Sequence, residues 1–156
     1  MKKVHLFAVC MLLLALTACG AGEETVETTE AQLTDGVSIT YYHGNDRGSQ
    51  LVPETTLIPK LTAQALLDLL AEQKVIPQGT GVRNFRLADG VITLDLTREF
   101  EEEAQTLSRS KEEIMVGSLV NTFLETYEAS GLELTTEGRI LKTRHHLYDG
   151  VLEFSN

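Results

Sequence analysis

The sequence predicts an α+β fold, in which a small mixed or antiparallel sheet of about five to six strands is packed on one face by two helices. Two observations lead to this prediction. Segments in which apolar residues alternate with polar ones outnumber the segments with helical periodicity. Short polar turns join most of these strand-like segments, so hairpins are expected to outnumber crossover connections.

The first strands are predicted in the stretch that begins at Val37. Apolar side chains alternate over 37–41, the polar sequence HGNDRG follows at 43–48, and a second strand-like run covers 51–58. Pro53 lies inside the second run and lacks an N–H group, which indicates an edge strand or a bulge.

Two helices are predicted from capping residues and apolar spacing. Thr62 is suited to cap a helix that ends before Pro77 and carries Leu66, Leu69 and Leu70. The sequence SKEE at 110–113 fits a capping box, with Ser110 as the cap of the second helix. The stripe of that helix consists of Val116, Leu119, Val120, Phe123 and Tyr127. Gly131 is expected to stop it, and short strands are expected near 132–135, 139–142 and 150–154.

Between the helices, the stretch 82–96 is predicted to be a hairpin with a two-residue turn at Asp89-Gly90. The turn sets a register in which the pairs Leu87–Ile92, Phe85–Leu94 and Arg83–Leu96 form an apolar face. The pairs Ala88–Val91, Arg86–Thr93, Asn84–Asp95 and Val82–Thr97 form the polar face. Asp95 then lies diagonal to Arg86 on the solvent side, where an ion pair contributes at most ~1 kcal/mol.

The acidic run at Glu99 and Glu101–Glu103 is a candidate catalytic site, because paired carboxylates can act as acid and base. Such pairs need burial that drives their pKa values apart, and this run is interpreted as a solvated loop. A glycan-cleaving site would also need aromatic platforms, and the sequence contains no Trp.

The histidines and glycines do not complete a known site either. His145 and His146 are adjacent, so in a strand their side chains would point to opposite faces and could not easily share a metal ion. GTGVRN at 79–84 lacks the third glycine of a dinucleotide loop, and no G-x-S-x-G motif occurs. The sequence therefore predicts no enzyme activity, no cofactor, and neither catalytic nor metal-binding residues.

The N-terminus predicts where the protein resides. Lys2 and Lys3 precede a short apolar run, and the sequence LTAC closes the segment at Cys19. This pattern resembles the bacterial lipoprotein signal, which implies that 1–18 is a signal peptide and that Cys19 is lipidated. The alternative is that Cys19 is an ordinary thiol after a simple secretory cut. Lipidation would place the protein at the cell membrane, on its extracytoplasmic face.

Charge and composition separate a tether from a domain. The segment 19–36 contains five acidic residues and no basic one, which predicts a flexible tether that holds the domain about 20–25 Å from the membrane. The remaining residues, 37–156, are enough for one domain. A formal net charge of −10 disfavours nucleic acid as a partner, and membrane association is expected to depend on the lipid at Cys19.

Four segments, in order, are similar to the GerMN domain family of sporulation and germination proteins. They are VSITYYHGNDRGSQLVPET (37–55), VIPQGTGVRNFRLADGVITLDLTREF (75–100), SLVNTFLETYEASGLE (118–133) and EGRILKTRHHLYDGVLEF (137–154). The resemblance implies that 37–156 is a GerMN-like domain with a fold related to ring-building motifs. It also implies a role in assembly at the cell envelope and supplies no catalytic residues.

Three functions follow as expectations. The first is a non-catalytic, lipid-anchored envelope domain that binds protein partners or copies of itself, with a link to sporulation or germination. The second is a lipoprotein that binds peptidoglycan or a small ligand through Tyr41, Tyr42 and the polar face of the hairpin. The third, a wall hydrolase or metal-dependent enzyme, would use the acidic run and His145-His146.

Overall fold

The computed structural model describes residues 36–155, so the predicted signal peptide, Cys19 and the tether up to residue 35 lie outside the described residues. The strands are β1 (Val37–Gly44), β2 (Leu51–Ile58), β3 (Val82–Ala88), β4 (Val91–Leu96), β5 (Gly131–Thr136), β6 (Arg139–Lys142), β7 (Leu147–Tyr148) and β8 (Val151–Leu152). The helices are α1 (Ala63–Glu72), α2 (Arg98–Ala104) and α3 (Arg109–Thr126). The predicted α+β class is confirmed, with a third helix that the sequence did not suggest. In the part of the chain that the structure describes, no helix is long and apolar enough to cross a membrane.

Strands β1 and β2 form an antiparallel sheet of their own. Tyr42 lies opposite Pro53, and the Tyr42 N–H donates to the Thr122 hydroxyl of α3 at 3.0 Å. Among residues 36–155, β2 pairs only with β1, so the missing N–H of Pro53 breaks no ladder hydrogen bond on the other edge of β2 there. The predicted edge position of Pro53 is confirmed.

The second sheet has six strands. Its order is β3-β4-β5-β6-β7, and β8 also pairs with β5. Strands β4 and β5 are parallel, whereas the other pairs are antiparallel. A parallel pair needs a crossover connection, which α2 and α3 provide between these two strands.

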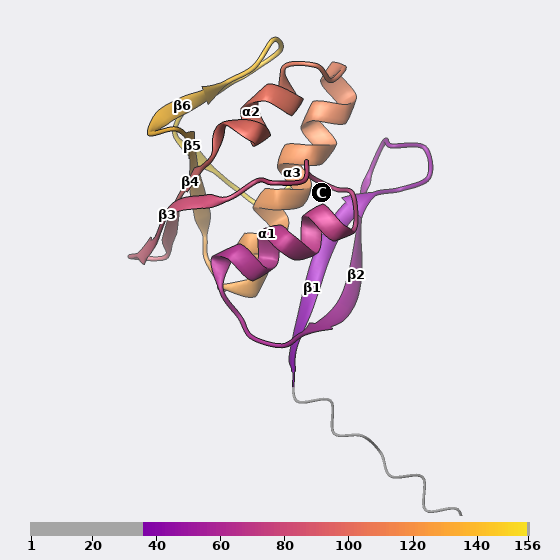
Figure 1. Ribbon diagram of the computed structural model, residues 1–156, viewed down its shortest axis with the longest axis vertical. Coiled ribbons are helices and arrows are strands. Elements are labelled where there is room, and N and C mark those ends of the chain that lie inside the picture. The colour runs from indigo at the N-terminus through magenta and orange to yellow at the C-terminus, as the bar shows by residue number, and fades with distance from the viewer. Residues whose placement is uncertain (1–35, 156) are drawn as a thin grey trace, which may run out of the picture. The chain divides into compact units, whose positions relative to one another are not determined.

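Helices α1 and α3 lie between the two sheets, and α3 contacts both β1 and β5 (Figure 1). Thr62 caps α1 as predicted, since its hydroxyl accepts the Ala65 N–H at 3.0 Å. The largest fully buried side chains are Phe100, Phe123, Leu66, Leu67, Leu70, Ile92, Leu94, Leu96, Leu119, Leu132, Leu134 and Leu141. Each contributes roughly 1.5–3 kcal/mol by leaving water, so the contacts between these helices and sheets hold the domain together.

The β3–β4 hairpin forms at the predicted turn. Asp89 and Gly90 have φ angles of 52° and 78°, as a two-residue type I′ turn requires. The predicted register is confirmed for Ala88–Val91, Leu87–Ile92, Arg86–Thr93, Phe85–Leu94 and Asn84–Asp95. Leu87 was expected on the buried face, but its side chain is 43% exposed because β3 is the edge strand of the sheet.

Beyond these pairs, the hairpin departs from the predicted register. A bulge between Val82 and Asn84 places Val82 opposite Leu96 instead of Thr97. The predicted pairing of Arg83 with Leu96 is therefore wrong. A bulge inserts one extra residue into a strand and re-aims its side chain, and Arg83 is that residue.

Helix α3 also differs from prediction at both ends. It begins at Arg109 after Ser108, so the predicted capping box at Ser110 is wrong. At the other end the helix stops at Thr126, before a residue with positive φ, Glu128 at 50°. Gly131 does not end the helix but opens β5.

The reason for a glycine at position 131 is packing. A Cβ atom there would lie 2.1 Å from Val151 Cγ1, so only a residue without a side chain lets β8 pair with β5 at this point.

Candidate functional site

Asp95 organises the open end of the β3–β4 hairpin. Its carboxylate accepts hydrogen bonds from Arg83 Nε at 3.1 Å, from the Thr135 hydroxyl at 2.8 Å and from the Gly138 N–H at 2.8 Å. The predicted solvent-exposed pair of Asp95 and Arg86 is wrong, because the bulge brings Arg83 to this side and Asp95 is only 9% exposed.

These contacts set the charge state of Asp95. Burial by itself raises its pKa, but the hydrogen bonds from Gly138, Thr135 and Arg83 outweigh burial and hold the pKa below its ordinary value. Arg83 also donates to Glu137 in the β5–β6 turn at 2.7 Å. Asp95 therefore ties β3, β4 and β5 together as a charged acceptor.

The acidic run lies on α2, so the predicted solvated loop is wrong. Phe100 and Ala104 are four residues apart and both are buried, which gives the segment an apolar helical face. Glu101 accepts a hydrogen bond from the Thr136 hydroxyl at 3.0 Å, whereas Glu102 and Glu103 are exposed. The run thus anchors α2 to the end of β5.

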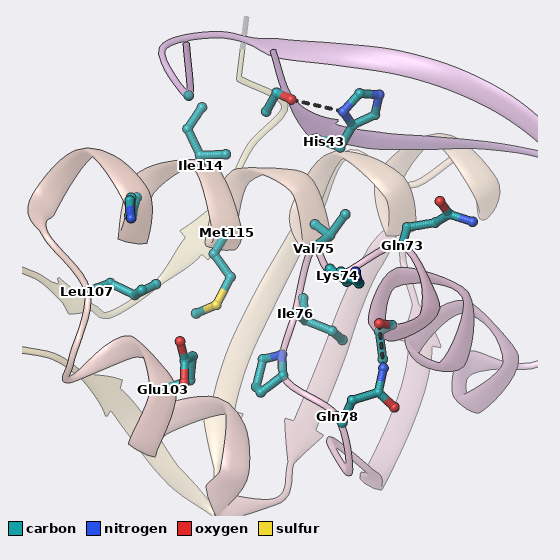
Figure 2. Close-up of a pocket in the computed structure, with 15 residues that line it drawn as sticks. His43, Gln73, Lys74, Val75, Ile76, Gln78, Glu103, Leu107, Ile114 and Met115 are labelled. Atoms are coloured by element: carbon teal, nitrogen blue, oxygen red, sulfur yellow. Dashed lines mark hydrogen bonds between the residues drawn. The ribbon is translucent and has the colours of Figure 1, made fainter. Parts of the chain in front are cut away.

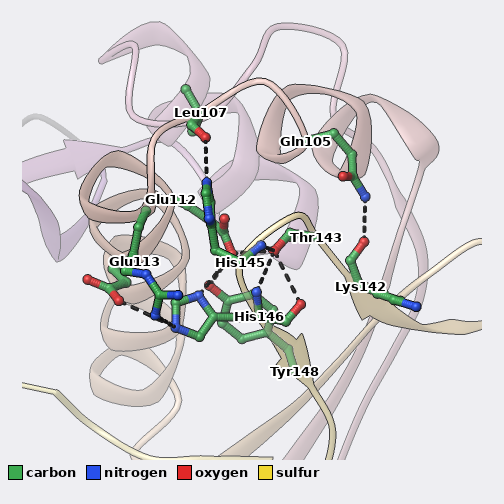
Figure 3. Close-up of polar contacts among 10 residues, drawn as sticks. Gln105, Leu107, Glu112, Glu113, Lys142, Thr143, His145, His146 and Tyr148 are labelled. Atoms are coloured by element: carbon green, nitrogen blue, oxygen red, sulfur yellow. Dashed lines mark hydrogen bonds and ion pairs between the residues drawn. The ribbon is translucent and has the colours of Figure 1, made fainter.

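His145 and His146 lie in the loop between β6 and β7, and their rings have separate partners (Figure 3). His145 Nε2 is 3.2 Å from the Leu107 carbonyl oxygen. His146 Nδ1 is 3.2 Å from Glu112, and its Nε2 is 3.4 Å from Glu113. Within residues 36–155, no group of three or more His, Cys, Asp or Glu side chains is placed to hold a metal ion.

Glu112 is the most deeply buried charged side chain of this region, with no exposed surface. Its Oε1 accepts hydrogen bonds from the hydroxyls of Thr143 and of Tyr148, the latter at 2.9 Å, and lies 3.2 Å from His146 Nδ1 (Figure 3). Its Oε2 has no hydrogen-bond partner among the described residues. Glu112 thus fastens the loop 143–148 to α3.

The partners of Glu112 lie 31 to 36 residues away in the sequence. Burial raises the pKa of Glu112, but the hydrogen bonds from Thr143, Tyr148 and His146 outweigh burial and lower it. Burial and donation to Glu112 both raise the pKa of Tyr148. No local pattern could have indicated this cluster, because its members are far apart in the sequence.

A pocket of about 590 Å³ lies between the tip of the β1–β2 hairpin, the loop after α1 and the α2–α3 junction (Figure 2). Its apolar wall consists of Val75, Ile76, Leu107, Ile114 and Met115. Its polar side chains are His43, Gln73, Lys74, Gln78, Glu103 and Lys111. No sequence pattern indicates this pocket, because its residues come from separate elements and match no motif.

Two local backbone features shape the pocket. Lys74 has a φ of 60° and donates its N–H to the Ala71 carbonyl, while Val75 N–H donates to the Leu70 carbonyl at 2.8 Å. This geometry is a Schellman-type end to α1, and it turns the chain along the pocket wall. At the hairpin tip, a Cβ on Gly44 would lie 2.9 Å from Ile114 Cγ2, so glycine lets β1 approach α3.

The two tyrosines of β1 have different surroundings. Tyr41 is 2% exposed and belongs to the core, which confirms that one of the pair is buried. The Tyr42 hydroxyl donates to Glu125 at 2.5 Å, and its ring packs edge-on against Phe154. Burial and the contact with Glu125 raise the pKa of Tyr42 to about 12. The pair therefore does not form one aromatic platform.

The outer face of the larger sheet carries exposed apolar side chains. Val151 lies opposite Glu133, Ile140 opposite Thr135, and Leu147 opposite Lys142. Alternation along β5 and β6 puts these pairs on one face. Ile140, Leu147 and Val151 are 52%, 53% and 48% exposed, and these three residues are called the outer-face patch below.

Comparison with known proteins adds a family and a fold. The Germane family, described as sporulation and spore germination, matches residues 35–142. The structure is similar to the tandem GerMN domains of the sporulation protein GerM from Bacillus subtilis, with 16% sequence identity and a TM-score of 0.57. That match covers 85% of this chain and 50% of the tandem chain, so this chain spans about half of that structure.

A second similar structure is the first GerMN domain of the sporulation protein GerM from Bacillus subtilis. The identity is 23%, the TM-score is 0.54, and the match covers 76% of this chain and 94% of that one. Among curated proteins, no sequence matches this chain.

Proposed function

Because the chain belongs to the Germane family of sporulation and spore germination, we propose that it is a non-catalytic, lipid-anchored domain that assembles with protein partners or copies of itself at the cell envelope. The GerMN-type fold supports the link to sporulation and germination. The outer-face patch supports assembly through a protein surface.

The outer-face patch is the observation that carries the proposal. Ile140 and Leu147 lie on the paired strands β6 and β7, Val151 lies on β8, which pairs with β5, and each residue is about half exposed. Exposed apolar side chains gathered on one face of a sheet are costly in water and mark a candidate interaction site. Strand β7 ends the sheet order, so its outer backbone groups can also pair with another strand.

The acidic clusters support a non-catalytic role. Asp95 and Glu112 both accept several hydrogen bonds from within the fold, and neither lines the pocket of about 590 Å³. Groups engaged in this way hold elements together. They are not placed to exchange protons with a substrate.

Light scattering of the soluble chain that starts after Cys19 tests self-association. Cross-linking of the full chain in cells tests the binding of partners. A photo-reactive residue at Leu147 is expected to capture a partner or a second copy, and Ile140→Asp is expected to abolish capture. The matched control is Leu57, which is 50% exposed on β2. A strict monomer with no adduct at Leu147, or equal adducts at Leu147 and Leu57, would contradict assembly through this patch.

The lipid anchor has a separate test. Cys19→Ser removes the sulfur to which the lipid would be attached, so the full-length variant is expected in the soluble fraction and the unsubstituted chain in the membrane fraction. Labelling with a fatty-acid analogue should follow the same pattern. Unchanged membrane association of the variant would contradict anchoring at Cys19.

A further inference from the structure

We propose that the pocket between the β1–β2 hairpin and α3 binds a short peptide that ends in a free carboxylate. This site is separate from the outer-face patch, because no residue of the patch lines the pocket. The two proposals can therefore fail independently.

The size and wall of the pocket suit a small, partly apolar ligand. A volume of about 590 Å³ falls within the range of small-molecule sites, roughly 300–1,000 Å³. Ile114 and Met115 reach it from α3, and Val75 and Ile76 reach it from the loop after α1 (Figure 2). An aliphatic side chain of a ligand would leave water against this wall.

The charges at the rim select an anion. Lys74 and Lys111 both line the pocket, and neither forms an ion pair with an acid of residues 36–155. Glu103 is the one carboxylate in the lining. In a chain with a net charge of −10, two lysines without acidic partners beside one pocket provide complementarity to a carboxylate.

The amides distinguish a peptide from other anions. Gln78 Nε2 donates to the Ala71 carbonyl at 2.5 Å, which leaves the Gln78 side-chain oxygen able to accept an N–H. Gln73 is exposed at the end of α1 and carries both a donor and an acceptor. A peptide group matches these amides. A fatty acid would leave them unused, and a free phosphate would leave the apolar wall unused.

The backbone at Lys74 adds an independent observation. Its φ of 60° is a left-handed conformation that glycine adopts with less strain, at the position where helices most often have glycine. A lysine at this position strains the fold. From this position Lys74 lines the pocket.

The test is an NMR titration of the isotope-labelled soluble chain with N-acetyl-alanyl-leucine and, separately, with its C-terminal amide. We expect shifts at Val75, Ile76 and Met115 and a Kd on the order of 0.1–1 mM for the acid, as for other ligands of this size. The amide should bind roughly tenfold more weakly, since it lacks the charge that faces the lysines. Equal binding of the two probes, or no shifts with either, would overturn the proposal.

Three variants test whether Lys74 and Lys111 bind the carboxylate of the peptide. Lys74→Gly removes the side chain while relieving the backbone, so it should fold at least as well and bind the acid about fivefold more weakly. Lys111→Gln should weaken binding to a similar degree. Lys60→Gln, an exposed lysine outside the pocket, is the matched control and should leave the Kd unchanged. Equal losses in all three variants would indicate general charge attraction and contradict a built site.

Discussion

Two buried acids of this domain are held in different ways. Asp95 receives a guanidinium, a hydroxyl and a backbone N–H, so donors surround both of its oxygens. Glu112 is more deeply buried, has no lysine or arginine partner, and keeps Oε2 without a partner among the described residues. Both have lowered pKa values, because hydrogen bonds outweigh burial in each case.

The two regions differ in how much of their structure is held by the carboxylate. Asp95 closes a sheet whose strands already pair through backbone hydrogen bonds, so its loss leaves those strands paired. Glu112 holds the loop 143–148, in which β7 has only two residues. The position of the loop around His146 therefore depends largely on side-chain contacts, and Glu112 takes part in three of them.

The largest expected effect comes from Glu112→Ala. Removing the carboxylate leaves the Thr143 and Tyr148 hydroxyls without their acceptor and creates a cavity, which should lower the free energy of unfolding by about 3 kcal/mol. Urea unfolding at pH 7 measures this. Glu113→Ala, an exposed neighbour, should change it little, and equal losses in the two variants would show that Glu112 has no special role.

Asp95→Ala should cost less, about 2 kcal/mol, because Arg83 is partly exposed and can be solvated when its partner is lost. The same urea measurement gives the value. Asp95→Asn keeps an acceptor for the Gly138 N–H and should retain part of the stability. A loss larger than that of Glu112→Ala would reverse the ranking of the two regions.

Low pH should lower the free energy of unfolding by less than the two alanine substitutions do, since a protonated carboxyl group still accepts some hydrogen bonds. Because each folded pKa lies below its unfolded value, the stabilisation is complete above about pH 5 and is lost as pH falls through the folded pKa values. Stability measured from pH 7 to pH 2.5 should therefore fall below about pH 4.5. Removing both acids should flatten this part of the profile, and an unchanged slope would contradict their role.

Tyr148→Phe removes one of the hydroxyl donors to Glu112 and should cost about 1 kcal/mol. A double-mutant cycle with Glu112→Ala checks it, because the effect should largely vanish once the acceptor is absent. Additive losses would mean that the hydrogen bond does not couple the loop to α3.

The smallest expected effect is a difference between Asp95 and Glu112 in how the stability cost of their substitution depends on salt. Charge screening acts on the partly exposed pair of Arg83 and Asp95, so the cost of Asp95→Asn should decrease in about 0.5 M NaCl. The cost of Glu112→Ala should stay constant, because its main donors are buried hydroxyls. Equal salt dependence would show that both acids are held by charge.

The sequence predicted the elements whose signals are local. The cap at Thr62, the turn at Asp89-Gly90 and the edge position of Pro53 follow from the geometry of one or two residues, and the structure confirms them. The short helix α2 was missed because its acidic composition suggested a solvated loop, while only two buried residues define its apolar face.

The candidate sites were less predictable than the elements. A bulge one residue long changed the partner of Asp95 from Arg86 to Arg83, and alternation alone cannot locate a bulge. The pocket near Lys74 combines segments separated by many residues, so no spacing rule reveals it.

The sequence by itself determined the α+β class, the family resemblance and most of the strand register, because periodicity and turn chemistry act over a few residues. Only the tertiary structure decided which charged groups are buried. Glu112 meets Thr143 and Tyr148 across more than 30 residues of chain, and such a meeting depends on how α3 packs between two sheets. Burial is a property of that packing, and burial turns an acidic residue that looks solvent-exposed into a structural tie.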